Sequence, residues 1–214
     1  KVYEPLKRND LVEARKMLSF IVSRDTESLD LGDIIRGTVE TVAENISDGI
    51  IAPLFYAFIG GAPLALAYKA SSTLDSMVGY RNEKYEDIGY ASAKLDDVLN
   101  FIPSRITGLL IVASSFLLGY DYKNSFYILK RDRLKHESPN SAHGEAAIAG
   151  ALGVKLGGLN YYFGMPELKP ELGDGKEDLK LNHIKDSIKI MYVTSFLGLA
   201  LFFALKLIIL NGGI

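Results

Sequence analysis

Three acidic residues stand just before a long apolar segment, at a spacing that could build a polar site. Glu40, Glu44 and Asp48 lie four residues apart, so in a helix they form one stripe. Like charges at this spacing repel by roughly a few tenths of a kcal/mol per pair, and by more where the dielectric constant is low. Arg36, one turn earlier, can offset the charge of Glu40. The remaining carboxylates need solvent, a metal cation or a substrate ammonium group, and a solvated helix face is the simplest interpretation.

A second polar cluster is LDDVLNFIPSR. Asp96 and Asn100 share a helix face, Asp97 is adjacent, and Arg105 follows Pro103, which is expected to end the helix. Oxygen ligands at this spacing suit Mg²⁺, which usually takes one or two carboxylates together with substrate phosphates. The pattern DDxxN is also common on solvated helices, so by itself it is a weak indication of a metal site.

Two further stretches combine charged and hydroxyl side chains. IVSRDT (21–26) contains Arg24 and Asp25, and YKASSTLDSMVGY (68–80) contains Lys69, Asp75 and Ser76. Arg24 and Lys69 are natural partners for phosphate or carboxylate groups. Neither stretch matches a P-loop or a GxGxxG turn, so a bound nucleotide would be held in some other way.

The stretch HESPNSAHGEAA (136–147) predicts a turn followed by a helix. Pro139 and Asn140 favour the turn, and Glu145 opens the helix where a negative charge suits its dipole. His136 and His143 could act as general bases, although a histidine in a loop is more often simply exposed.

Long apolar segments predict the environment of these motifs. The chain is 48% hydrophobic with a mean hydropathy of +0.13, and its apolar segments cover about 49–68, 101–120 and 190–210. A helix needs about 20 mostly apolar residues to cross the hydrocarbon core of a bilayer. We therefore predict an all-α, polytopic integral membrane protein forming a single domain over 1–214, with interfacial helices. Buried helices of a soluble protein are the alternative.

The first apolar segment is compatible with two paths through the membrane. It carries IGGAP near its centre, which suits either one interrupted span or two half-helices forming a re-entrant hairpin. In the hairpin form, every polar region faces one side, and the excess of Lys and Arg makes that side cytoplasmic. We expect the hairpin form, and with it a plasma-membrane protein whose polar motifs face the cytoplasm.

Local signals predict the remaining elements, and little of the chain is typical of a strand. The expected elements are a helix capped by Asp10, another beginning near Asp30 or Asp33, a third over 86–100, a small-residue helix over 144–158, and a loop over 168–178.

Composition also excludes several classes of function. With 24 basic and 26 acidic residues, net charge gives no support to a nucleic-acid partner. The chain has no cysteine, which excludes disulfides and thiolate metal sites. Its three histidines form no HxH or HxxxH pair, so a zinc site is not expected.

The polar stretches, taken in order, resemble a known family. VSRDT, VETVAENISDGIIAPLFYAFIGGAPLALAYKA, STLDSMVGYRNEKYEDIGYASAKLDDVLNFIPSR, HESPNSAHGEAAIAGALGVKLGG and YYFG resemble the CobD/CbiB family, the adenosylcobinamide-phosphate synthases. The resemblance covers about 11–164. It departs at Ser72, where the family commonly has Asn, and at 142–144, where it often has Gly and Pro. Family members usually carry more apolar sequence before the position of Lys1, so one or two N-terminal spans are expected to be absent here.

The resemblance implies a membrane enzyme of cobalamin biosynthesis. Such an enzyme joins a carboxylate of the corrinoid adenosylcobyric acid to (R)-1-amino-2-propanol or its O-phosphate, forming an amide with ATP and Mg²⁺. A lipid bilayer is the expected surroundings, and a homo-oligomer or a complex with other membrane proteins of that pathway is a further expectation.

We assign hypothetical roles within this reaction to the residues of the matching motifs. The predicted catalytic carboxylates are Glu44, Asp48, Asp75 and Asp97, and the predicted Mg²⁺ ligands are Asp48, Asp96 and Asp97. The predicted substrate-binding residues are Arg24, Asp25, Asn45, Lys69, Ser76, Asn100, Arg105 and Asn140.

Two other functions remain open at the level of the sequence. A Mg²⁺-dependent membrane prenyltransferase would use DDxxN with a second acidic motif. The stripe of Glu40, Glu44 and Asp48 could be mistaken for that second motif. A non-enzymatic transporter or assembly factor would need charges inside the apolar segments, whereas nearly all charges here lie outside them.

Overall fold

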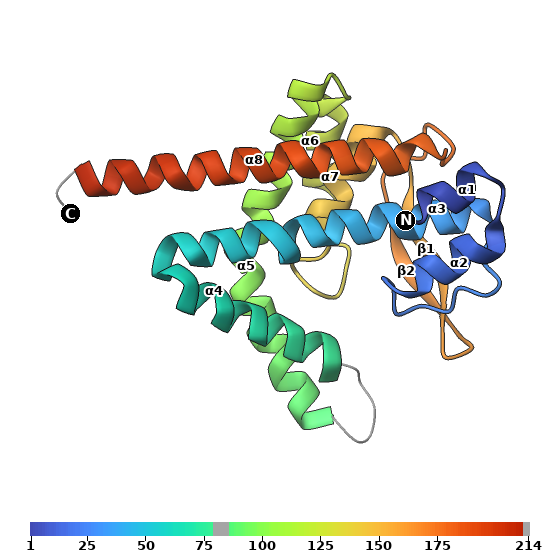
Figure 1. Ribbon diagram of the computed structural model, residues 1–214, viewed down its shortest axis with the longest axis horizontal. Helices are drawn as coiled ribbons and strands as arrows, with labels where there is room; N and C mark the ends of the chain where they lie inside the picture. The colour runs from blue at the N-terminus through green and yellow to red at the C-terminus, as the bar shows by residue number, and fades with distance from the viewer. Residues whose placement is uncertain (79–85, 212–214) are drawn as a thin grey trace.

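The computed structural model describes residues 1–78 and 86–211 (Figure 1). Its elements are α1 (Tyr3–Lys7), α2 (Leu11–Ser19), α3 (Leu31–Asn45), the π-helix η1 (Ile46–Ile51), α4 (Ala52–Val78), α5 (Glu86–Leu118), α6 (Tyr122–Asp132), α7 (Ala142–Leu152), β1 (Leu156–Tyr162), β2 (Met165–Leu172) and α8 (Asn182–Asn211). The predicted all-α class is confirmed, with one β-hairpin added. The predicted starts near Asp10 and Asp30 are also confirmed, since each side chain accepts a backbone hydrogen bond three residues on.

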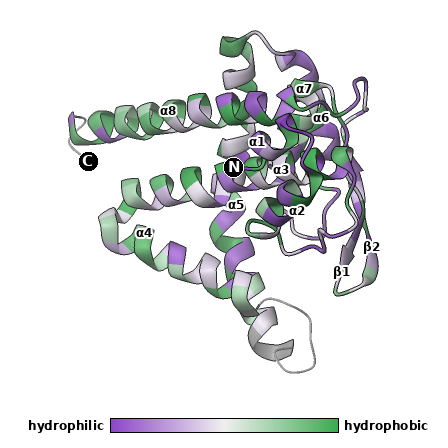
Figure 2. Cartoon of the chain, turned by 45° about the vertical axis from the view of Figure 1, so that its right-hand side comes forward, coloured by the Kyte–Doolittle hydropathy of each residue, from purple (hydrophilic) through white to green (hydrophobic). Residues whose placement is uncertain are grey.

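Three segments of the described chain are long and apolar enough to cross a bilayer, as the sequence predicts. They are Leu31–Met77, Gly89–Leu118 and Asn182–Asn211. Figure 2 shows hydrophobic residues along α8 and the first part of α4, and hydrophilic residues concentrated around α2, α6 and the strands. Large apolar side chains such as Phe196 and Phe203 are exposed on α8. A continuous apolar surface of this kind fits lipid contact.

The first apolar segment reverses direction at Gly60 and Gly61. Gly61 has φ 66° and ψ −161°, a conformation open to glycine alone. Figure 1 shows the chain turning back within α4. Tyr56 and Tyr68 on the two arms stack with ring centroids 5.0 Å apart. The rise from Asp48 to the turn is about 18 Å, short of the ~30 Å hydrocarbon core. The geometry is that of a hairpin rather than one straight span.

The prediction that Pro103 ends a helix is wrong, because α5 continues through it. Proline cannot donate the hydrogen bond to the carbonyl four residues earlier, here that of Leu99. The Tyr56 hydroxyl donates to that carbonyl at 2.7 Å, so the freed acceptor is satisfied. As a result, Asp96, Asp97 and the apolar segment that follows share one helix.

A tight antiparallel hairpin occupies part of the region expected to be loop. Tyr162 pairs with Met165 across Phe163 and Gly164, whose φ angles are 54° and 76°, as a two-residue type I′ turn requires. The predicted loop over 168–178 is therefore wrong for 168–172, which belong to β2.

Helix α7 is buried along its whole length, and its small residues allow close packing as predicted. A Cβ on Gly144 would lie 2.8 Å from the Ala43 carbonyl oxygen, and one on Gly150 would lie 2.6 Å from that of Asn124. The predicted helix over 144–158 is too long, because Gly153 ends α7 in a left-handed conformation and β1 follows.

Candidate active site

A polar pocket lies where η1, α5 and the start of α7 meet. Its lining residues are Ala43, Glu44, Ser47, Asp48, Asp96, Asn100, Ser138, Asn140, Ser141 and Gly144. Five of them were predicted site residues, drawn from segments almost a hundred positions apart. Because Gly144 lets α7 approach α3 closely, the turn before α7 forms one wall of this pocket.

Asp48 lies within η1, the single turn of π-helix. A π turn closes hydrogen bonds five residues apart, which widens the helix and shifts the positions after it relative to a regular α-helix. Such turns are frequent at functional sites. The sequence predicts regular helix over 40–50, and no local signal in it indicates the π turn.

Carboxylates concentrate around this pocket. Asp48 lies close enough to Glu44 and Asp96 for their charges to repel, and Asp96 interacts in the same way with Asp75 and Asp97. The Lys69 ammonium group lies close enough to Asp48 to attract it. The acids of the first stripe, of α4 and of α5 therefore share one region, as the hairpin interpretation predicts. Their mutual repulsion would fall on binding a cation.

Asn100 connects Asp96 to the returning arm of α4. Its amide nitrogen donates to Asp96 Oδ2 at 3.0 Å, and its Oδ1 accepts from the Tyr68 hydroxyl at 2.9 Å. Asp96 Oδ1 has no hydrogen-bond partner among the described residues. Tyr68 was not predicted as a site residue, although it opens the quoted stretch 68–80.

Asn140 organises the opposite wall. Its amide nitrogen donates to the Asp97 carbonyl at 2.8 Å, and its Oδ1 accepts from Arg105 at 2.8 Å and from Ser104 at 3.3 Å. Ser138, which the sequence analysis missed, donates to Asp97 Oδ1 at 2.7 Å. Asp97 and Arg105 therefore hold the turn before α7 in place through their side chains.

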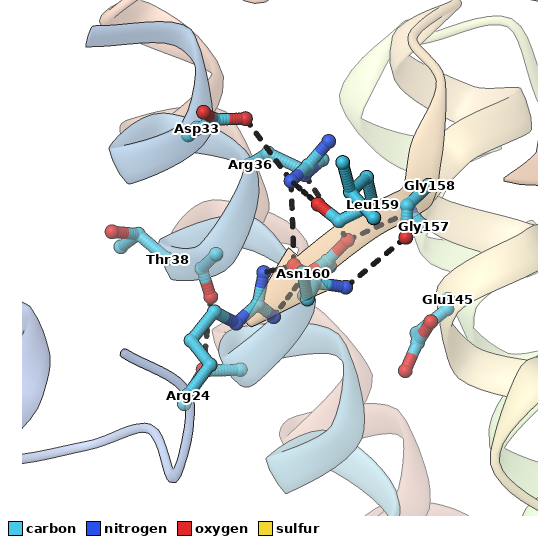
Figure 3. A network of polar contacts seen from close by, with 12 residues as sticks. Arg24, Asp33, Arg36, Thr38, Glu145, Gly157, Gly158, Leu159 and Asn160 are labelled. Carbon is cyan, nitrogen blue, oxygen red and sulfur yellow. Dashed lines mark hydrogen bonds and ion pairs between the residues drawn. The ribbon is translucent and has the colours of Figure 1, made fainter. Parts of the chain in front are cut away.

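A separate network engages Glu40, the first acid of the stripe (Figure 3). Arg24 forms a buried ion pair with Glu40 and donates to Asn160 Oδ1 at 2.6 Å. The Gly157 amide donates to the other Glu40 oxygen at 2.7 Å, and Arg36 lies 3.8 Å from it. These contacts tie β1 to α3. Glu40 is thus compensated within the protein, and only Glu44 and Asp48 of the stripe reach the pocket.

Besides Lys69 and Arg105, described above, four predicted binding residues lie outside the pocket lining. Arg24 belongs to the network above, and Asp25 accepts hydrogen bonds from the Phe163 and Gly164 amides at 3.2 and 2.7 Å. Asn45 donates to the Thr41 carbonyl of its own helix, and Ser76 to that of Ser72. The structure gives all four a local structural role. Their predicted contact with substrate stays a prediction.

Neither histidine of 136–147 is exposed, contrary to the usual state of loop histidines: His143 is buried and His136 is partly buried. Burial, with the nearby Arg105 charge, lowers the pKa of His143 to about 4, so its ring is neutral near pH 7. His136 Nε2 lies 3.7 Å from Glu145 Oε2. Burial, together with repulsion from Glu40 and Glu44, raises the pKa of Glu145 well above its usual value.

The fit of a divalent cation rests on the donor set. Within the described residues, no group of three His, Cys, Asp or Glu side chains is arranged to hold a metal ion on its own. Mg²⁺, however, needs only one or two carboxylates when phosphates complete its shell. Asp48 and Asp96 line one pocket, and Asp96 Oδ1 is unpaired. Asp97, by contrast, accepts bonds from Ser138 and Asn140, so it suits the ligand role less well.

Comparison with known proteins now decides the family. Residues 1–191 match the family model described as CobD/Cbib protein. The chain belongs to the CobD/CbiB family. A relative named "Cobalamin biosynthesis protein CobD" from Clostridium perfringens is 58% identical over 98% of this chain, and one of that name from Citrobacter koseri is 51% identical over 98%. "Cobalamin biosynthesis protein CbiB" from Salmonella paratyphi B is 53% identical over 96%.

These CobD/CbiB relatives are longer than the chain. It spans 66% of the Clostridium and Citrobacter proteins and 64% of the Salmonella protein. No solved structure matches the chain.

Proposed function

We propose that this CobD/CbiB chain acts in cobalamin biosynthesis, the process that its relatives are named for. We further propose the amide-forming step: an ATP-dependent ligase joins adenosylcobyric acid to (R)-1-amino-2-propanol or its O-phosphate. The observation that carries this proposal is the acidic pocket, where Glu44, Asp48 and Asp96 meet beside polar amides. Such a pocket suits the ammonium group of an amine acceptor and a phosphate-bound Mg²⁺.

The chemistry requires activation, because a carboxylate oxygen is a poor leaving group. Transfer of a phosphoryl group from ATP to the corrinoid carboxylate gives an acyl phosphate and ADP. The amine then attacks the acyl carbon, and phosphate leaves as the amide forms. When bound, Mg²⁺ supplies charge stabilisation for the phosphates.

The residues divide into groups that would bind and groups that would position. Asp48 and Asp96 would hold the cation, and Glu44 would take the proton that the ammonium group loses before attack. Lys69, beside Asp48, would bind a phosphate oxygen. Asn100 and Asn140 would orient the substrates.

The remaining predicted residues support this arrangement. Asp97 and Arg105 hold Asn140 through the hydrogen bonds described above. Asp75 adds negative charge behind Asp96. We propose a plasma-membrane location with the pocket on the cytoplasmic side, where ATP is present. The apolar surfaces of α4 and α8 support a membrane location.

A product assay tests the reaction. The complete gene product, inserted in lipid nanodiscs, is incubated with adenosylcobyric acid, ATP, Mg²⁺ and each amine in turn, and products are identified by mass. We expect one amide whose mass equals the sum of the corrinoid and the amine less one water. A parallel incubation replaces the amine with a prenyl diphosphate. Prenylated product, or no amide with any amine, would contradict the proposal.

A further inference from the structure

Two stacked tyrosines in the hairpin of α4 contact consecutive residues of α5, Leu99 and Asn100. Tyr56 donates to the Leu99 carbonyl at 2.7 Å, and Tyr68 donates to Asn100 Oδ1 at 2.9 Å. The first contact satisfies the acceptor that Pro103 leaves free and so supports the helix itself. The second reaches a side chain that lines the pocket. The Tyr56 hydroxyl therefore supports helix α5, whereas the Tyr68 hydroxyl binds a side chain of the pocket.

The direction of the second contact follows from Asp96. An ionised carboxylate can only accept hydrogen bonds, so the amide nitrogen of Asn100 must face Asp96 Oδ2, 3.0 Å away. The carbonyl oxygen of Asn100 then faces Tyr68, whose hydroxyl must donate. The same hydroxyl lies 3.4 Å from the Asp48 carbonyl oxygen, a longer contact than the 2.9 Å to Asn100 Oδ1.

Burial makes this arrangement rigid. Tyr68 and Asn100 are each 2% exposed, so neither water nor a mobile side chain can replace the bond easily. Without the Tyr68 hydroxyl, Asn100 Oδ1 would be buried without a donor, and the amide could turn away from Asp96. With it, Asp96 Oδ2 is fixed, while Oδ1 is buried without a partner in a side chain that lines the pocket.

We propose that Tyr68 is a positioning residue: through Asn100 it fixes the Asp96 carboxylate so that Oδ1 meets a cationic ligand. The ligand chemistry is a positive charge, supplied either by a divalent metal or by the ammonium group of the amine acceptor. This inference rests on the proposed function for the identity of those two cations. Tyr68 itself touches neither ligand. Tyr68 lies on the returning arm of the hairpin, and its hydroxyl couples the fold of α4 to the site through Asn100.

The test compares Tyr68→Phe with Tyr56→Phe in the complete gene product in nanodiscs. Both variants keep the ring and the stack, and each removes one hydroxyl. Three quantities are measured for each: thermal stability, the binding of Mg²⁺ and of aminopropanol phosphate by calorimetry, and the dependence of kcat and KM on each cation.

For Tyr68→Phe we expect roughly tenfold weaker binding of one cation, with a matching rise in its half-saturating concentration. The titration in which binding weakens, with Mg²⁺ or with aminopropanol phosphate, identifies the cation as metal or ammonium. For Tyr56→Phe we expect a lower melting temperature with unchanged cation dependence, because only the helix loses a bond. Wild-type cation binding in Tyr68→Phe, or an equal effect of both substitutions, would overturn the proposal.

A double-substitution cycle separates this role from general packing. In an Asn100→Leu background, adding Tyr68→Phe should change cation binding less than twofold, because Tyr68 acts only through Asn100. A full tenfold loss in that background would overturn the proposal. If Tyr68→Phe fails to fold, Asn100→Leu takes its place. It neither accepts from Tyr68 nor donates to Asp96 and adds no charge, and wild-type cation binding by that variant would also overturn the proposal.

The two binding titrations test the role of Tyr68 separately from the proposed reaction. A wild-type protein that binds a cation but forms no amide would contradict the proposed function, while the same titrations would still decide the role of Tyr68. A wild-type protein that binds neither cation would overturn both.

Discussion

Charge compensation distinguishes acids that look equivalent along one helix stripe. Glu40 is matched by Arg24 and by the Gly157 amide, whereas Glu44 and Asp48 face other carboxylates. A buried ion pair with its hydrogen bonds complete needs no further partner, but an incomplete cluster gains from binding a cation. At this scale the network around Arg24 is structural, and the pocket around Asp48 is available for chemistry.

The first prediction concerns Arg24. Arg24→Lys keeps the positive charge but loses the second donor, which now reaches Asn160. We expect it to lower the free energy of unfolding by roughly 1–3 kcal/mol, measured by thermal or denaturant melting in detergent. The exposed Arg8→Lys serves as the matched control. A variant with wild-type stability but a raised KM would instead favour the substrate-binding role predicted from the sequence.

The second prediction concerns pH and Glu145. Burial and the charges of Glu40 and Glu44 raise its pKa, so the folded protein holds a proton that the unfolded chain releases above its usual pKa. Stability from this group is therefore present at low pH and lost as pH rises toward the folded pKa. Lys169 and Arg24 reduce the effect without reversing it.

Glu145→Gln cannot ionise and should escape this loss. Its melting temperature relative to the wild type should increase between about pH 5 and about pH 8. The comparison cancels contributions from other groups, including the opposite one of His143. A difference that stays constant or shrinks with rising pH would contradict the assignment of a raised pKa.

Among the elements, the hairpin of α4 brings polar residues back toward the pocket from the membrane segment. Its turn depends on Gly61, whose φ and ψ lie in a region that other residues rarely adopt. Its returning arm brings Lys69 and Tyr68 back to Asp48 and Asn100. The hairpin also supplies the hydroxyl that lets α5 pass through Pro103.

The third prediction follows from this turn. Gly61→Ala should destabilise the protein by roughly 1–3 kcal/mol, because a Cβ strains this backbone conformation. It should also reduce amide synthesis per folded molecule by displacing Tyr68. The neighbouring Ala62→Gly, at an exposed position, is the control and should cost no more than ~1 kcal/mol of helix propensity. Equal melting temperatures for Gly61→Ala and wild type would contradict the hairpin turn.

For the whole molecule, the hairpin determines which polar segments share a side of the membrane. The chain has no cysteine, so single cysteines can be introduced and labelled without background. The fourth prediction is that cysteines at the exposed positions 45 and 73 react with a membrane-impermeant reagent from the same side, while one at 62, next to the turn, reacts slowly. Labelling of 45 and 73 from opposite sides would show a full span and would separate the acids of the two arms.

The sequence predicted much of this arrangement, and the failures have physical causes. Apolar length and IGGAP predicted the membrane segments and the reversal, since both depend on local composition. The prediction that Pro103 ends the helix failed because the Leu99 carbonyl, which Pro103 leaves without a donor, accepts from Tyr56, more than forty positions away. The β-hairpin was missed although PELKPEL alternates in polarity, and the π turn gave no signal among those considered. Arg24 and Asp25 were assigned to the site from their chemistry, whereas tertiary partners decide their contacts.

The initial rate of amide synthesis by Asp48→Asn and Asp96→Asn tests the central claim most directly. Both substitutions keep the size of the side chain and one acceptor oxygen while removing one negative charge from the pocket. With membrane insertion and melting temperature preserved, we expect each rate to fall at least about 100-fold, whereas the Asp33→Asn control keeps the wild-type rate. Wild-type rates in both pocket variants would contradict the assignment of this site.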